Sequence, residues 1–333
     1  MRVLLLGIAM LSPWLVQAQQ VPLATHNQMN AFAVNSAFAG IEGTMDARLG
    51  HRQQWVGFDG APMTSWLTVH GSFGKKARKP FPYGLHLTDT TIVSKLFSQA
   101  KPRVRHGWGV QFMYDRLGAF DRMQGNIAYS IHLPLTKSVT LALSPNIGIS
   151  NHGIRPGDIY LLDPNDPLYQ QYIGSNGRFT HLDVGASALL YGKQWWVGYS
   201  AKQLLGNKVY FGDQPTQAKL DIHHFVQAGY IFKLSESTEL QTNLMAGLAG
   251  ANPMIGEASA RVRVHQRFWG GFSWRYQSTI SAMVGLNISS CLSIAYAYDY
   301  PYSMSRANTL GTHEVMLGIR PFNKTRKQNQ FLW

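Results

Sequence analysis

Residues 268–300 read FWGGFSWRYQSTISAMVGLNISSCLSIAYAYDY, a pattern typical of successive amphipathic β-strands. Large apolar residues alternate with small or polar ones, most regularly in the run Leu292, Ser293, Ile294, Ala295, Tyr296, Ala297, Tyr298, Asp299 and Tyr300. Because neighbouring side chains on a strand point to opposite faces, each such strand has one apolar face and one small or polar face. The same alternation recurs from about residue 43 to residue 320, where helical periodicity is scarce.

Fourteen such runs can be marked along the chain, and most are about 9–11 residues long, the length that a tilted strand needs to cross a bilayer. A closed antiparallel bacterial barrel with both termini on one side requires an even number of strands. The sequence therefore predicts an all-β fold, a transmembrane antiparallel β-barrel of about fourteen strands with periplasmic termini. The expected strands are 43–53, 65–74, 107–117, 123–133, 139–149, 181–191, 194–202, 223–233, 240–249, 256–263, 268–276, 279–288, 292–300 and 312–320.

The composition of the 333 residues supports this interpretation. Charged residues are 14% and aromatic residues 12%, while the mean hydropathy is −0.13, which excludes a bundle of membrane helices. A soluble β-sandwich would also alternate. The aromatic apolar faces, the polar opposite faces and an export signal favour a membrane barrel, because a closed barrel satisfies its backbone groups within lipid. The single cysteine, Cys291, excludes an internal disulfide framework and a multi-cysteine metal site.

The N-terminal residues have the features of a signal peptide. Arg2 supplies a positive start, residues 3–16 are almost wholly apolar, and Ala18 ends a cleavage pattern of small or aliphatic residues. We therefore divide the chain into a signal peptide (1–18), an N-terminal periplasmic or plug segment (19–42), the outer-membrane barrel (43–320) and a basic periplasmic tail (321–333).

The connections between the expected strands are unequal in length and charge. The long connections 54–64, 150–180, 203–222 and 301–311 fall on the outer side, as barrels of this kind require. The connection 75–106 is the exception, since it is long and periplasmic, with a net charge of +7, and residues 320–333 add +4. This one-sided charge indicates either anchoring at lipid headgroups or an acidic protein partner.

Signals for catalysis or for a cofactor are weak. The sequence has no G-x-S-x-G elbow, no Walker loop and no H-E-x-x-H motif. His223 and His224 are adjacent, so on a strand they would point to opposite faces rather than bind one metal ion. We expect no catalytic residues, no cofactor, no metal and no nucleic-acid partner.

Two segments near the N-terminus carry a specific resemblance. Residues 35–40 read NSAFAG, within a stretch that we expect to form a short helix or a plug at the barrel mouth, and residues 52–64 read RQQWVGFDGAPMT. They resemble the N-P-A-[YF]-A-G and R-x-Q-W-x-G-x-x-G-A-P-x-T patterns of the PorP/SprF family of Bacteroidetes outer-membrane proteins, with Ser36 in place of the family proline. Further similarity lies in residues 114–118, 129–135, 296–300 and 313–318, so it spans almost the whole mature chain.

This resemblance implies a non-enzymatic outer-membrane barrel of type IX secretion and gliding. Its partners would be periplasmic lipoprotein or ring components, and a secreted or surface-anchored protein with a C-terminal sorting domain. Two alternatives stay open, a porin for small solutes and an outer-membrane enzyme with a Ser, His and acid at one rim. The candidate partner-binding residues are Arg52, Gln54, Trp55, Gly57, Gly60, Pro62, Lys75, Lys76, Arg78 and Lys79.

Overall fold

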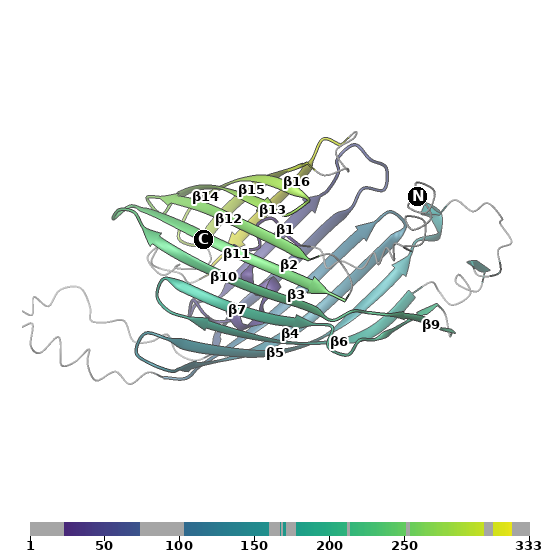
Figure 1. Ribbon diagram of the computed structural model, residues 1–333, viewed down its shortest axis with the longest axis horizontal. Helices are drawn as coiled ribbons and strands as arrows, with labels where there is room; N and C mark the ends of the chain where they lie inside the picture. Colours follow the sequence, from purple (N-terminus) through teal and green to yellow (C-terminus); the bar gives the residue numbers. More distant parts are fainter. Residues whose placement is uncertain are drawn as a thin grey trace, which may run out of the picture.

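The computed structural model describes residues 23–73, 103–159, 167, 169–170, 178–211, 214–250, 254–302 and 309–321. Fourteen of the described strands form one closed antiparallel barrel, which Figure 1 shows from the side. These strands are β1 (Asp46–Gln53), β2 (Met63–Phe73), β3 (Arg105–Leu117), β4 (Phe120–Pro134), β5 (Thr140–Ile154), β6 (Arg178–Tyr191), β7 (Trp195–Lys202), β10 (His223–Lys233), β11 (Thr238–Ala249), β12 (Ile255–Val264), β13 (Phe268–Arg275), β14 (Thr279–Asn287), β15 (Leu292–Pro301) and β16 (Thr312–Ile319).

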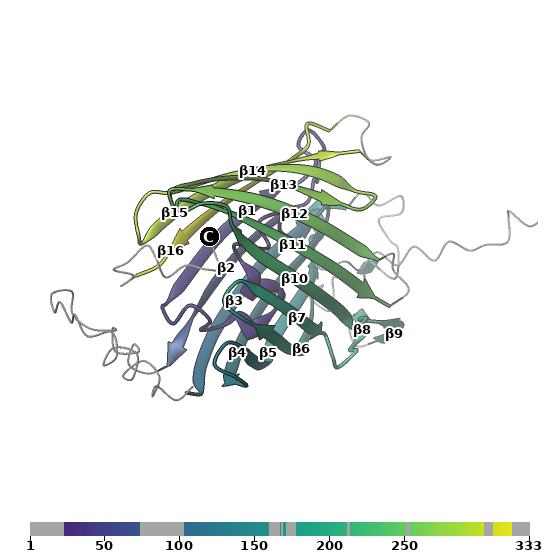
Figure 2. The ribbon, with the colours of Figure 1, turned by 60° about the vertical axis from the view of Figure 1, so that its left-hand side comes forward.

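Strand order around the barrel follows the sequence, and the first and last strands close it. β1 pairs with β16 in a register that sets Arg52 opposite Glu314. β7 pairs directly with β10, so the hairpin of β8 (Lys208–Phe211) and β9 (Gln214–Lys219) is a separate two-stranded sheet outside the barrel. Figure 2 shows this hairpin beyond the ends of β6 and β7. The predicted barrel of about fourteen strands is thus confirmed.

The two faces of the strands differ as the alternation predicts. Outward positions hold exposed apolar residues such as Ile127 and Phe272, whose exposed fractions are 60% and 69%. Inward positions hold polar and charged residues that are almost fully buried, including Arg48, Gln241 and Arg261. An apolar outer surface and a polar lumen are typical of a transmembrane barrel. No helix among the described residues is long and apolar enough to cross a membrane.

The two ends of the barrel can be told apart by their connections. The start of β1, the end of β16 and the short turns after β4, β6, β10, β12 and β14 share one end. We call this the periplasmic end, because bacterial barrels have their short turns there, and the opposite end the outer end.

Three sequence-based expectations need correction. The first strand begins at Asp46 rather than residue 43, because a turn with Gly43 at a φ of 69° precedes it. β4 and β5 have 15 residues each and extend past the expected ends at residues 123 and 149. Near the outer end these strands hold polar residues on both faces, such as the neighbours Asp121 and Arg122 and the neighbours Asn151 and His152, so alternation no longer marks the strand. The expected loop 203–222 contains the hairpin of β8 and β9.

Candidate functional site

Residues 23–44, which we call the lumen segment, lie inside the barrel (Figures 1 and 2). The segment contains a four-residue helix, α2 (Ala31–Val34), and a 3-10 turn, η1 (Ser36–Phe38). Its apolar residues pack on inward side chains of the wall, with Phe32 and Phe38 in one cluster with Leu189 and Trp196. Strands on opposite sides of the barrel donate or accept its hydrogen bonds, namely β1 to β7, β12, β15 and β16. The segment therefore closes most of the lumen.

At the outer end, the lumen segment is held by a group of buried charges that we call the latch. It consists of Thr25, His26, Arg52, Asp299 and Glu314. The backbone N–H groups of Thr25 and His26 donate to the Glu314 carboxylate at 2.7 and 2.8 Å, and His26 Nδ1 lies 2.8 Å from the same carboxylate. Arg52 bridges the two acids, 2.6 Å from Asp299 and 3.0 Å from Glu314, and also donates to the Thr25 hydroxyl. Buried charges need such partners, because removal of one leaves the others uncompensated.

The next residues of the segment bind β12. Asn27 Nδ2 donates to Glu257 at 2.7 Å, and Arg275 of β13 pairs with the other oxygen of that carboxylate at 2.8 Å. The Gln28 amide donates to Ser259. Two consecutive residues after the latch, Asn27 and Gln28, are thus each bound by a side chain of β12.

At the periplasmic end, side chains of the wall bind the backbone of the segment. The carbonyl of Ala39 accepts from Ser130 Oγ at 2.6 Å and lies 2.8 Å from His132 Nε2. Gly107 of β3 lets the segment approach this closely, since a Cβ there would lie 2.2 Å from the Ala39 oxygen. Gly40 turns the chain with a φ of 77°, a conformation that glycine adopts without strain.

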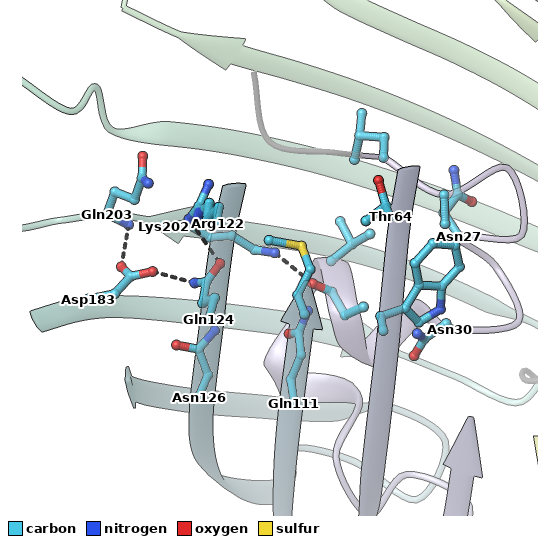
Figure 3. Close-up of a pocket in the computed structure, with 16 residues that line it drawn as sticks. Asn27, Asn30, Thr64, Gln111, Arg122, Gln124, Asn126, Asp183, Lys202 and Gln203 are labelled. Carbon is cyan, nitrogen blue, oxygen red and sulfur yellow. Dashed lines mark hydrogen bonds between the residues drawn. The ribbon is translucent and has the colours of Figure 1, made fainter. Parts of the chain in front are cut away.

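A small polar cavity remains between the lumen segment and the wall (Figure 3). Its volume is about 50 Å³, which is enough for a few water molecules, and Asn30, Trp66, Gln111 and Asn126 are among its lining residues. The Asn30 amide nitrogen, the Trp66 indole nitrogen and the Asn126 carbonyl oxygen have no hydrogen-bond partner among the described residues. These groups suit ordered water or a small polar molecule better than an apolar ligand.

Charged groups line the other side of the same cavity (Figure 3). Gln124 donates to Asp183 at 2.6 Å and accepts from Arg122 at 2.9 Å, and the backbone N–H of Gln203 completes the set around Asp183. Lys202 donates to the carbonyl of Ala33 at 2.6 Å, which joins this part of the wall to the lumen segment. The cavity is thus a gap beside the segment with polar groups on both sides.

A second candidate site is the loop between β1 and β2, residues 54–62, which we call the rim loop. With the turn between β3 and β4 it forms a groove of about 580 Å³, whose apolar walls include the exposed side chains of Trp55, Phe58, Leu117 and Phe120. Apolar side chains exposed together on one rim are typical of a surface that contacts a protein or lipid.

Backbone hydrogen bonds fix the rim loop on both sides. Val56 exchanges bonds of 3.0 and 2.9 Å with Gly311 and Leu310, and Gly60 accepts from the Gly118 N–H at 2.9 Å. Gly60 has a φ of 70°, and a Cβ there would lie 3.2 Å from the Gly118 Cα. The loop geometry therefore depends on glycine at this position.

The candidate residues of the sequence fall into four groups. Trp55, Gly57 and Gly60 are exposed on the rim loop, with positive φ angles of 46°, 104° and 70°. Gln54 donates its N–H to the buried Pro62 at 2.8 Å, so these two residues close the base of the loop. Arg52 lies inside the lumen as part of the latch, away from the rim surface. The four basic candidates, Lys75, Lys76, Arg78 and Lys79, lie outside the described residues.

Sequence reasoning missed the charged interior. Glu257 and Glu314 occupy inward positions of their strands, and alternation alone places them there. Their role could not be read from the sequence, since the Thr25 and Glu314 contact joins residues 289 positions apart.

Groups that could bind a metal ion are not found among the described residues, where no three histidine, cysteine or acidic side chains come together. His223 is buried and His224 is exposed on the outer face, where its ring lies 2.8 Å from the Tyr199 hydroxyl. The two rings thus point to opposite sides of the wall.

Comparison with solved structures returns membrane channels of low similarity. The toluene transporter TodX of P. putida has 9% identity and a TM-score of 0.42 over 85% of this chain and 89% of that one. The CymD monoaromatic hydrocarbon channel has 9% identity and a TM-score of 0.46 over 90% and 92%. A search of curated proteins found no match.

A family model gives the assignment that these distant structures do not. The model of the type IX secretion system membrane protein PorP/SprF matches residues 16–319. The match includes the lumen segment, the rim loop and all fourteen barrel strands. This chain is therefore a member of the PorP/SprF family of type IX secretion system membrane proteins.

Proposed function

We propose that this protein is a non-enzymatic docking barrel of type IX secretion in the outer membrane of a Bacteroidetes bacterium. The observation that carries the proposal is the pairing of a filled lumen with a fixed apolar groove on the outer rim. A lumen occupied by residues 23–44 does not suit a wide porin, whereas a fixed groove suits contact with another protein. Family membership supplies the secretion context.

The two ends of the barrel would bind different partners. The rim loop lies at the outer end, where a secreted or surface-anchored substrate with a C-terminal sorting domain would meet it. The basic connection between β2 and β3 and the basic tail follow the periplasmic ends of their strands. These would contact periplasmic lipoprotein or ring components of the machine, and a gliding adhesin is one class of substrate.

The test is affinity purification of the tagged barrel from native membranes in mild detergent, followed by mass spectrometry. A rim variant, Trp55→Ser with Phe58→Ser, removes the apolar walls of the groove. A basic-segment variant changes Lys75, Lys76, Arg78 and Lys79 to Ser. We expect the rim variant to lose a large secreted or surface protein, and the basic-segment variant to lose a periplasmic component.

A matched control keeps the test specific. Leu205→Ser also removes an exposed apolar side chain from an outer connection, but this residue does not line the groove. The control should retain every partner. If the wild-type barrel is recovered alone, the docking proposal is wrong, and planar-bilayer conductance becomes the next measurement.

A further inference from the structure

The lumen segment crosses the barrel from one end to the other. Thr25 and His26 bind residues near the outer ends of β15 and β16, Val34 and Asn35 bind the middle of β7, and Ala39 and Ile41 bind residues near the periplasmic ends of β3 and β4. The part nearest to β1 is thus at the periplasmic end. The first described residues of the segment lie at the outer end, although β1, the strand that follows the segment, starts at the periplasmic end.

The two ends of the segment both pack in apolar clusters, but only the outer end is also held by the buried charges of the latch. Near the periplasmic end, Ala37, Phe38 and Ala39 pack in an apolar cluster, and the chain then continues into β1. At the outer end, buried polar and charged contacts add to the packing of Met29 against Trp66 and Met316. Glu314 accepts from the backbone N–H groups of Thr25 and His26 and contacts the His26 ring. Asp299 and Arg52 bind the Thr25 hydroxyl, and Glu257 accepts from Asn27.

Loss of the Glu314 carboxylate would remove three contacts of Thr25 and His26 and take one of its two carboxylate partners from Arg52. The hold on the outer end would therefore weaken, while the inner end would stay in place.

The cavity of Figure 3 lies beside the released part. Leu23, Ala24, Asn27 and Asn30 form one side of it, and strands β2, β3, β4, β6 and β7 form the other. Its wall carries the amides of Gln111, Gln124 and Asn126 together with the charged side chains of Arg122 and Asp183. Enlarging this gap would produce a polar path along the wall.

We propose that the lumen segment is a gate, and that the latch holds this gate closed at the outer end. When the Glu314 contacts break, residues 23–30 move out of the lumen at the outer end, and a path for small polar solutes opens in the space that they leave between β15 and β16 and the facing strands β2, β3 and β4. The proposal does not depend on docking, since partner binding is measured by copurification and gating by conductance.

The first experiment measures the conductance of the full-length protein in planar bilayers. The variant Glu314→Ala removes the latch carboxylate. The control Glu239→Ala removes a half-buried carboxylate that pairs with Arg263 at the periplasmic end of β11, away from the latch. We expect at least a tenfold rise in mean conductance for Glu314→Ala over wild type, and no rise for Glu239→Ala. Equal conductance of folded Glu314→Ala and wild type would overturn the proposal, as would equal opening of the control.

A cross-link tests whether movement of the segment causes the opening. The side chains of Asn30 and Thr68 lie 2.8 Å apart, so cysteines at these positions, with Cys291→Ser, can join the segment to β2. In the Glu314→Ala background, oxidation should lower the conductance to the wild-type level. A reductant, which breaks the cross-link, should raise the conductance again. Opening that persists after verified cross-linking contradicts the gate.

A third measurement leaves the latch intact, in case Glu314→Ala does not fold. Ala24→Cys with Cys291→Ser is exposed to a membrane-impermeant thiol reagent on intact cells. Leu205→Cys serves as the outer reference, and the native Cys291, in the periplasmic turn between β14 and β15, serves as the protected one. Labelling of Ala24→Cys like Leu205→Cys supports the proposal. If Ala24→Cys is protected from the reagent as fully as Cys291, the start of the segment does not lie at the outer end, and the proposal is overturned.

Discussion

At the scale of single residues, Arg52 shows how a surface candidate becomes an interior one. It lies in the motif that resembles the family, yet its side chain is 4% exposed and is shared between Asp299 and Glu314. We expect Arg52→Met to lower the free energy of unfolding by about 3–5 kcal/mol, because two buried carboxylates lose their cation. Urea titration followed by tryptophan fluorescence in micelles measures this loss. Adding Glu314→Gln should recover part of it, and no recovery would contradict the charge explanation.

Gly107 gives a second prediction at this scale. Gly107→Ala would push on the backbone of Ala39 and on the Ser130 hydroxyl, at a cost of about 1–3 kcal/mol. Gly256→Ala is the matched control on another strand, since the nearest atom to a Cβ there lies 3.6 Å away. The same urea titration compares the two variants. Equal unfolding midpoints would show that the lumen segment is not held tightly at Gly107.

At the scale of elements, the hairpin of β8 and β9 is an addition to the barrel. Because β7 and β10 pair directly, replacing residues 208–219 by a short Gly-Ser linker should leave the barrel intact. We expect the heat-dependent shift in gel mobility that marks a folded barrel to be unchanged. A variant that loses this shift would show that the hairpin is needed to pair β7 with β10.

How far the sequence predicts these elements depends on what surrounds each strand. Within the membrane, lipid on one side and the lumen on the other impose alternation, so all fourteen barrel strands could be placed. Beyond it, as at the outer ends of β4 and β5, both faces carry polar residues and the pattern ends before the strand does. The rim loop could be located by its Gly and Pro residues. The latch could not, because its contacts join Thr25 and His26 to strands at the other end of the chain.

At the scale of the whole molecule, the apolar outer surface predicts how the barrel lies in the bilayer. Phe272 projects outward from the middle of β13, and Tyr276 lies just beyond the outer end of that strand. Phe272→Arg should cost about 2–4 kcal/mol, the value for arginine near the midplane, whereas Tyr276→Arg should cost about 0–1 kcal/mol. Reversible folding into lipid vesicles under urea measures both. Equal costs would mean that β13 crosses the membrane at a different depth.

The seam of the barrel has a consequence for the order of its assembly. Arg52 on β1 and Glu314 on β16 face each other across the junction of the first and last strands, and both also hold Thr25. The binding site for Thr25 is therefore incomplete until β16, the last strand, pairs with β1. Closing the wall and filling its interior become a single event. A nascent barrel must keep residues 23–44 within the curve of its growing sheet until the last strand is added.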